Sequence, residues 1–347
     1  MNLLRNAEKA LAQLKKWCNV AKIHVNVDKS AVMMIGTSFT NHIQLKYDNQ
    51  IIPSVSAITY LGVEVDSMLN FDAHVSKICQ AMENKLPLFS RLANGMNGYS
   101  SRLLLDTYKA LVIPSITYCS TIWTSCISRH KKRLDSAAKP YLVKIVKSNN
   151  GAAGEDLQIV TGMLSMDVEL NLANARYWIN RSNVTFVSVL CKMSISPVDI
   201  NWDEQTSLED KKNIIRGLAL TKWLNKVIVK RRANPTDKLL DKLLISTTHT
   251  FAGFPKIVHG AMTILTGVGN VESFLFTQRV ISSNLCRSTG RIGDVKHHVE
   301  ACPAQIQLRA RITSQIGLID LDRINWANLV DVLPQFAKLI PIYGRHR

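Results

Sequence analysis

The first seventy residues combine one helical pattern with several short strand patterns. Apolar residues recur at helical spacing through residues 3–19, with lysines mostly between them. Residues 22–27 then alternate polar and apolar positions, and residues 31–35 form an apolar run. This pattern predicts two short strands on either side of a turn at Asp28 and Lys29.

Three more strand patterns complete this stretch. Residues 43–45 alternate, and an apolar run resumes at residues 51–52 after a turn at residues 48–49. Residues 58–66 are rich in β-branched side chains and predict a strand that ends in a turn. We therefore expect residues 1–70 to form a small α+β unit.

Helical spacing replaces strand alternation from Phe71 onward. The apolar segments up to about residue 192 lack alternation, and the first of them recurs at Val75, Ile78, Met82, Leu86 and Phe89. Residues 194–210 predict a loop, and residues 214–229 and 236–244 predict two further helices. The expected fold is α+β at the N-terminus and mainly α beyond it.

Composition adds a strong basic charge to this picture. The 347 residues are enough for two or three domains, and 46% of them are hydrophobic, which argues against a disordered chain. Lysine and arginine total 43 against 26 acidic residues, so the net charge is +17 and the pI about 9.7. Such a charge favours a polyanionic partner, with nucleic acid ahead of a membrane surface.

The chain carries no pattern of a secreted or membrane protein. Its first residues lack the apolar core and cleavage site of a signal peptide. The long uncharged stretch 110–128 contains Pro114 and several serines and threonines, which favours a buried helix over a membrane span. Seven cysteines, an odd number, form no disulfide framework. We expect an intracellular protein, nuclear or cytoplasmic, whose oligomeric state stays open.

Three motifs resemble one protein family. The first motif, residues 23–30, reads Ile-His-Val-Asn-Val-Asp-Lys-Ser. The second combines residues 58–63, Ile-Thr-Tyr-Leu-Gly-Val, with their continuation at residues 70–75, Asn-Phe-Asp-Ala-His-Val. The third is a proline, a tyrosine and an isoleucine–tryptophan pair within residues 108–123. In this order the segments resemble the part of non-LTR retrotransposon reverse transcriptases, of the arthropod jockey-like or ribosomal-DNA-inserting type, that lies after the catalytic aspartates.

The tail adds a fourth match. Residues 265–269 read Leu-Thr-Gly-Val-Gly, similar to a signature that precedes a terminal zinc knuckle in several arthropod elements of this class. The resemblance implies a palm edge with a primer-grip hairpin at residues 1–70 and a helical thumb-like domain at 71–192. A linker with a helical segment would follow at 193–250, and a tail with a degenerate zinc knuckle at 251–347.

The polymerase chemistry of the family has no place in this sequence. The resemblance implies RNA-directed DNA polymerisation with two magnesium ions held by aspartates. No aromatic–x–Asp–Asp motif occurs, so we expect an incomplete, inactive chain whose magnesium site would belong to an upstream palm. The resemblance implies one catalytic candidate in this sequence, Lys29. The alternative interpretation of Lys29 is an exposed lysine in a turn. Asp28, Asp66 and Asp72 are expected to be turn or cap residues.

The resemblance also implies a binding surface for RNA or an RNA–DNA duplex. Tyr60, Leu61 and Gly62 would hold the primer end, although an ordinary strand and turn has the same pattern. Basic residues of the thumb would contact phosphates with little sequence preference and strong salt dependence. These residues are Lys77, Lys85, Arg91, Arg102, Lys109, Arg129, Lys131, Lys132 and Arg133. For any one of them the alternative is a solvated surface charge.

The knuckle departs from its family at one ligand. Cys286, His297 and Cys302 match three zinc ligands by resemblance, but the position of the second cysteine is Thr289. Threonine is a poor zinc ligand, so we expect weakened binding unless His298 or a water completes the shell.

The sequence is also compatible with two other kinds of protein. One is a domesticated, non-catalytic RNA- or DNA-binding protein, which would show salt-dependent affinity for nucleic acid. The other is a helical interaction protein whose charge is incidental and whose binding would not respond to salt.

Overall fold

The computed structural model describes most of the chain. The described residues are 2–36, 44–93, 98–203, 205–234, 238–246, 261–269, 271–317, 319–321, 333 and 335–340. They divide into two compact units, residues 1–80 with 122–130 (the first unit) and residues 81–121 with 131–347 (the helical unit). Each unit is described by itself.

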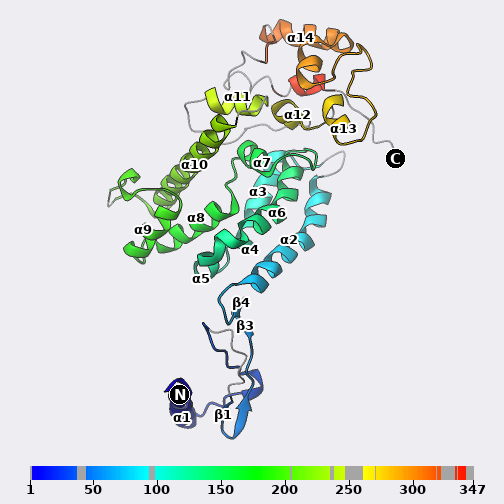
Figure 1. Ribbon diagram of the computed structural model, residues 1–347. Coiled ribbons are helices and arrows are strands. Elements are labelled where there is room, and N and C mark those ends of the chain that lie inside the picture. The colour runs from blue at the N-terminus through cyan, green and yellow to red at the C-terminus, as the bar shows by residue number, and fades with distance from the viewer. Residues whose placement is uncertain are drawn as a thin grey trace. The chain divides into compact units, whose positions relative to one another are not determined.

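The first unit begins with a helix packed beside a β-hairpin. Helix α1 (Asn2–Ala21) lies next to strand β1 (Leu45–Tyr47), which pairs antiparallel with β2 (Gln50–Ile52) (Figure 1). The alternating burial of β1 turns two of its three side chains inward. A small core results, formed by Val27, Leu45, Tyr47 and Ile52 against Ala7, Leu11, Val25 and Val32. The strand pattern at residues 43–52 therefore predicted this hairpin, although residues 37–43 lie outside the described part.

The two strands expected at residues 22–35 do not form. The described segment holds a short 3₁₀ helix, η1 (Val27–Lys29), and an isolated parallel bridge between Val32 and Ser54. The Asn26 side chain accepts the Lys29 N–H at 3.1 Å, and the Ser30 hydroxyl donates to the Asn26 carbonyl. Such local side-chain bonds stabilise a tight turn at the expense of extended strands.

The single strand expected at residues 58–66 is instead a hairpin. Strands β3 (Ala57–Tyr60) and β4 (Val63–Asp66) pair antiparallel, with Tyr60 opposite Val63. The two loop residues, Leu61 and Gly62, both have positive φ, at 47° and 83°. A two-residue loop of this kind matches the twist of the strands it joins.

Aspartate caps hold the exit of this hairpin. The Asp66 carboxylate accepts backbone N–H groups of Met68 and Asn70 at 3.0 Å and of Phe71 at 2.6 Å. Burial works to raise the pKa of Asp66, but these three donors outweigh it and hold the pKa below its ordinary value. The expected capping role of Asp66 is confirmed.

Helix α2 (Asp72–Ala93) starts directly after this cap. His74 is buried, accepts the Glu64 N–H through Nδ1 at 3.4 Å, and packs edge-on against Trp123 at 5.7 Å. It is thus a core contact of the first unit. The Asp72 carboxylate pairs with Arg129 at 3.0 Å.

The rest of the described chain is mainly helical. No single helix among the described residues is long and apolar enough to cross a membrane, whereas the bent pair 101–117 and 120–145 meets the criteria of length and composition. The helices are α3 (Ser101–Leu111), α4 (Ile113–Thr117), α5 (Ser120–Trp123), α6 (Ile127–Ile145), α7 (Gly154–Thr161), α8 (Met166–Trp178), α9 (Asn183–Lys192), α10 (Leu208–Ala233), α11 (Leu239–Ser246), α12 (Ala261–Thr266), α13 (Glu272–Thr277) and α14 (Ile306–Ile316). The short 3₁₀ helices are η2 (Thr124–Cys126), η3 (Pro197–Asp199), η5 (Pro303–Gln305) and η6 (Ala337–Leu339).

Helix α10 organises the core of the helical unit. It starts at the cap residue Ser207, whose side chain accepts the Asp210 N–H. Helices α8 and α9 pack against it (Figure 1). The apolar side chains enclosed there include Leu172, Leu190 and Ile215. The helix expected at residues 214–229 lies inside α10, so this expectation is confirmed.

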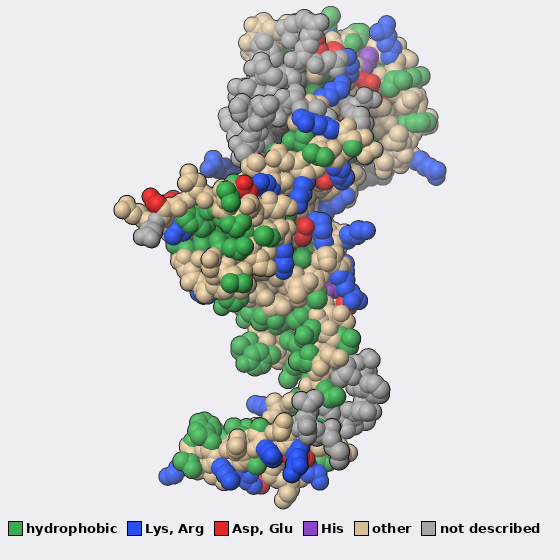
Figure 2. Space-filling view, turned by 60° about the vertical axis from the view of Figure 1, so that its left-hand side comes forward, with side chains coloured by type: hydrophobic (Ala, Val, Ile, Leu, Met, Phe, Trp, Pro, Cys, Tyr) green, Lys and Arg blue, Asp and Glu red, His purple; other side chains and the backbone are tan. Residues whose placement is uncertain are grey.

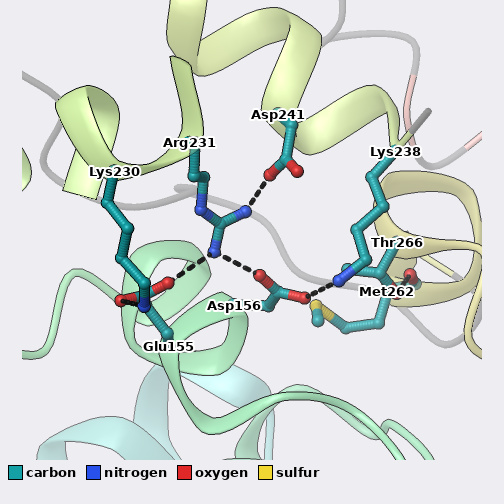
Figure 3. Close-up of polar contacts among 8 residues, drawn as sticks. All are labelled: Glu155, Asp156, Lys230, Arg231, Lys238, Asp241, Met262 and Thr266. Carbon is teal, nitrogen blue, oxygen red and sulfur yellow. Dashed lines mark hydrogen bonds and ion pairs between the residues drawn. The ribbon is translucent and has the colours of Figure 1, made fainter. Parts of the chain in front are cut away.

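A buried ion network joins α10 to α7 and α11. The Arg231 guanidinium contacts Asp241 and donates to Asp156 at 2.6 Å and to Glu155 at 3.1 Å (Figure 3). Lys238 donates to the second oxygen of Asp156 at 3.0 Å. Asp156 is fully buried, with 0% of its surface exposed, and Asp241 and Arg231 are also buried. We call this group the Arg231 network.

Candidate nucleic-acid interface and metal centre

The hairpin tip exposes the residues expected to hold the primer. Tyr60 is 67% and Leu61 73% exposed, and Gly62 is also exposed. Because the Tyr60 and Leu61 side chains are exposed at this turn, they contribute no burial of apolar surface to folding. The positive φ of Leu61 is also unfavourable for a residue with a side chain. Lys29 is exposed too, and its side chain makes no hydrogen bond or ion pair with any described residue.

Some of the expected phosphate contacts are already neutralised. Lys77 pairs with Glu64 at 3.1 Å, and Arg129 pairs with Asp72. Lys131 bridges two carboxylates, Asp135 at 3.1 Å and Asp167 at 2.5 Å. Lys85 donates to the Leu111 carbonyl, and Arg133 also has a polar or electrostatic contact.

Other members of the set carry unpaired charge. Arg91, Arg102, Lys109 and Lys132 are exposed on the helices of the helical unit and make no hydrogen bond or ion pair with any described residue. On the visible face of this unit, Lys and Arg side chains are spread widely with few Asp and Glu among them (Figure 2). These four cations are therefore available to an anionic partner.

A cavity of about 460 Å³ adds two basic residues that the sequence patterns did not single out. Its walls come from α6, α7, α10 and the start of α8, and Lys131 is one of its lining residues. Lys139 and Lys226 also line it and pair with no carboxylate in the described part. Trp223 supplies an aromatic wall.

The tail forms a tight turn around Cys286. Leu285 and Ile292 pair as an antiparallel bridge, and the Cys286 N–H donates to the Arg291 carbonyl at 2.7 Å. The N–H groups of Thr289 and Gly290 return to the Cys286 carbonyl. Gly290 has a φ of +67°, a value that suits glycine. This turn fixes the Cys286 thiol in a buried position.

The second half of the centre is a π-helical turn, η4 (His297–Ala301), followed by Cys302. Cys286, His298 and Cys302 are all buried, and their ligand atoms lie within 4.8 Å of one another. The two Sγ atoms are 3.8 Å apart. Two sulfurs on one tetrahedral zinc, each at about 2.3 Å, would lie about 3.8 Å apart. The spacing therefore fits zinc, and it is far longer than a disulfide bond.

A buried carboxylate orients His298. Its Nε2 lies 2.6 Å from Oε2 of Glu272, while its Nδ1 is buried and has no hydrogen-bond partner among the described residues. A carboxylate on one ring nitrogen and a metal on the other is the usual arrangement of zinc-binding histidines. Gly293 makes room for this pair, because a Cβ there would lie 2.3 Å from the same Glu272 oxygen.

His297, the residue expected to bind zinc, is not part of this group of three. Its Nε2 lies 3.2 Å from the Thr289 hydroxyl, so the two positions that match family ligands contact each other. Burial, with a smaller effect from His298, lowers the pKa of His297. Burial raises the pKa of the Cys302 thiol, an effect that a bound cation would oppose. The nearby Glu300 carboxylate accepts the Leu321 N–H at 2.8 Å.

The signal for His298 is present in the sequence. His298 and Cys302 are four residues apart, a spacing that places side chains on one face of a helical turn. The family spacing of histidine, four residues and cysteine pointed to His297 instead. Glu272 could not be found in this way, because it lies 26 residues from His298.

No protein-family model matches the sequence, and no solved structure matches it. Several curated proteins do match, all from retrotransposons. A Pol polyprotein of the type-1 element R1 4 from Nasonia vitripennis is 21% identical over 280 residues, which is 80% of this chain and 68% of that protein. The 115 kDa protein of element R1DM from Drosophila melanogaster is 19% identical over 82% of this chain.

A third relative carries an enzymatic name. The RNA-directed DNA polymerase of the mobile element jockey from Drosophila melanogaster is 22% identical over 124 residues, or 36% of this chain. The chain spans 27% of the R1DM protein and 14% of the jockey protein. The chain is thus a relative of the polyproteins of R1- and jockey-type non-LTR retrotransposons, and the resemblance drawn from its motifs is confirmed.

Proposed function

We propose that this chain is a template–primer-binding part of a retrotransposon RNA-directed DNA polymerase. It binds RNA or an RNA–DNA duplex through the helical unit. Relatives named as Pol polyproteins and as an RNA-directed DNA polymerase support this reading. The helical unit would act as the thumb. The hairpin tip at Tyr60 and Leu61 would contact the primer end.

The observation that carries the proposal is the set of unpaired cations on the helical unit. Arg91, Arg102 and Lys132 have no carboxylate partner in the described part, so a phosphate meets them without first displacing an acid. Each phosphate neutralised releases a counterion, which makes the affinity fall with salt. The net charge of +17 strengthens the long-range attraction.

Fluorescence anisotropy with a labelled RNA–DNA duplex tests this proposal. The full chain is compared with the triple variant Arg91→Gln, Arg102→Gln, Lys132→Gln at several salt concentrations. Each lost phosphate contact reduces the slope of log affinity against log salt by about 0.7–0.9. The matched control is the triple variant Lys192→Gln, Lys211→Gln, Lys212→Gln. Lys192 and Lys211 lie outside the predicted phosphate contacts, and Lys212 is already paired with Glu209. Binding that does not respond to salt, or equal slopes in the two triple variants, would sink the proposal.

The tail supports a second function, a structural zinc site. Cys286, Cys302 and His298 would hold the ion through two sulfurs and Nδ1, with a water as fourth ligand. The zinc would tie the Cys286 turn to η4 and supply folding free energy, as structural zinc does in small domains.

Cobalt(II) provides a spectroscopic test of the ligand set in the full chain. Two thiolate ligands give a sulfur-to-metal charge-transfer band, and a tetrahedral site gives intense visible d–d bands. We expect both bands in the unchanged chain and in His297→Gln, and their loss in His298→Gln and Cys302→Ser. Loss in His297→Gln with retention in His298→Gln would instead assign the site to the family's ligand set.

A further inference from the structure

In the helical unit, Arg216 pairs with the buried carboxylate of Glu169, and Arg176 and Lys109 lie near enough to Glu169 to interact with its charge. Arg216 of α10 donates to the Glu169 carboxylate through both terminal nitrogens, at 3.3 and 3.4 Å. Glu169 and Arg176 are seven residues apart on α8 and so share a helix face. Lys109 of α3 lies near enough to Arg216 and Glu169 for both charges to shift its pKa. We call Lys109, Arg176 and Arg216 the Arg176 cluster.

Arg176 lacks an acceptor in this arrangement. Its Nε is buried and has no hydrogen-bond partner, and no described carboxylate pairs with its guanidinium. Buried donors in native proteins are almost always bonded, so an unfilled one marks a place where a partner is missing. Burial first, and then the charge of Arg216, lower the pKa of Arg176.

The neighbouring acids do not fill the site. Both oxygens of Glu169 are already engaged by Arg216. Glu209 acts on Arg176 only at longer range and pairs with Lys212 at 3.2 Å in an exposed position. Asp106 acts on Lys109 from the next turn of the same helix. The buried Tyr108 hydroxyl, close to Glu169, is a further polar group that has no partner among the described residues.

We propose that Lys109, Arg176 and Arg216 form a binding site for a phosphate group. The planar guanidinium matches two phosphate oxygens at once, and Lys109 adds a point charge. The group can belong to a nucleic-acid backbone or to free pyrophosphate. Assignment to the backbone rests on the proposed function, whereas the site itself does not. Only Lys109 was expected from the sequence, because Arg176 and Arg216 lie outside the motifs that resemble the family.

Calorimetric titration of the full chain with pyrophosphate, and separately with single-stranded RNA, tests the site. The variant is Arg176→Gln, and its matched control is Lys192→Gln, an exposed residue of α9 that makes no polar contact in the described part. Loss of one charge-assisted contact should weaken pyrophosphate binding by about tenfold or more, while the control stays within twofold. Arg176→Lys should restore part of the affinity, which a purely structural role for Arg176 would not predict.

The two ligands separate the possible outcomes. Parallel losses for pyrophosphate and RNA in Arg176→Gln would support a site for backbone phosphate. A loss for pyrophosphate alone would support a site for a free phosphate compound and remove it from the RNA surface. Pyrophosphate binding without any RNA binding in the unchanged chain would leave the site standing and contradict the proposed function. Unchanged pyrophosphate affinity in Arg176→Gln would overturn the site.

Discussion

The Arg231 network and the Arg176 cluster use the same chemistry with opposite charge balance. Arg231 faces three carboxylates, Glu155, Asp156 and Asp241, and Lys238 shares one of them. In the Arg176 cluster, three cations interact with the charge of a single buried carboxylate, and Arg176 itself has no partner among the described residues. Both groups lie in the helical unit and both involve α10.

This difference separates a structural role from a binding role. A buried charge that is fully paired is costly to disturb, because removal of one partner leaves the other without water or a counterion. A half-buried cation without a partner contributes little to folding and remains available to an anion. Stability measurements should therefore respond strongly to substitutions in the Arg231 network and weakly to removal of the unpaired Arg176.

The largest effect is expected for Asp156→Asn. The variant removes the charge that faces both Arg231 and Lys238 in a fully buried position, and we expect a loss of about 3–5 kcal/mol in the free energy of unfolding. Urea unfolding followed by circular dichroism measures it. Glu155→Gln, at the more exposed edge of the same network, should cost clearly less. Equal losses in the two variants would mean that burial does not set the energy of the network.

A moderate effect is expected for Glu169→Gln. The side chain is buried, but Arg216 is partly exposed and can reach water when the charge disappears. We expect a loss of about 1–3 kcal/mol in the free energy of unfolding, the range for a hydrogen bond to a charged group. The exposed Glu209→Gln is the control and should change the same quantity by less than about 1 kcal/mol. A loss as large as that of Asp156→Asn would contradict the comparison.

The sequence predicts the helices of this protein better than its long-range polar contacts. Helical spacing predicted the helices, because apolar residues recur on the face of α2 and α10 that is buried. The turn at η1 was missed, because the competing bonds of Asn26 do not appear in a pattern of apolar residues. The Arg231 network and the Glu272–His298 pair join residues up to 82 positions apart, and only the fold brings them together.

A smaller, pH-dependent effect is expected at Lys131 and Asp167. Burial alone would raise the pKa of Asp167, but the hydrogen bond and charge of Lys131, together with hydrogen bonds from Ser165 and the Val168 N–H, outweigh it and lower the pKa below its ordinary value. Since the folded-state pKa is depressed, the pair contributes stability above pH 4 that is lost as the pH falls through this lower value. Asp167→Asn should cost about 0.5–1 kcal/mol at pH 7 and progressively less as the pH falls through the lowered pKa of Asp167. A difference that does not shrink as the pH is lowered would exclude this ion pair as its cause.

The smallest effect on the free energy of unfolding is expected for Arg176→Gln. The direction of this effect tests the contrast between the Arg231 network and the Arg176 cluster. Burial and the charge of Arg216 both disfavour the charged guanidinium, and no described acceptor compensates for them. Removing the charge should therefore leave the free energy of unfolding within about 0.5 kcal/mol of the unchanged chain, or slightly above it. Urea unfolding in phosphate-free buffer measures this effect, with Arg216→Gln as the contrasting variant that loses a paired charge.

Added pyrophosphate should then reveal the role that folding alone does not. A ligand that binds only the folded chain raises its stability in proportion to the logarithm of its concentration above the dissociation constant. The unchanged chain should gain stability with pyrophosphate, and Arg176→Gln should gain clearly less at the same concentration. A large destabilisation by Arg176→Gln without ligand would place this arginine with Arg231 among the structural charges, and the contrast between the two groups would fail.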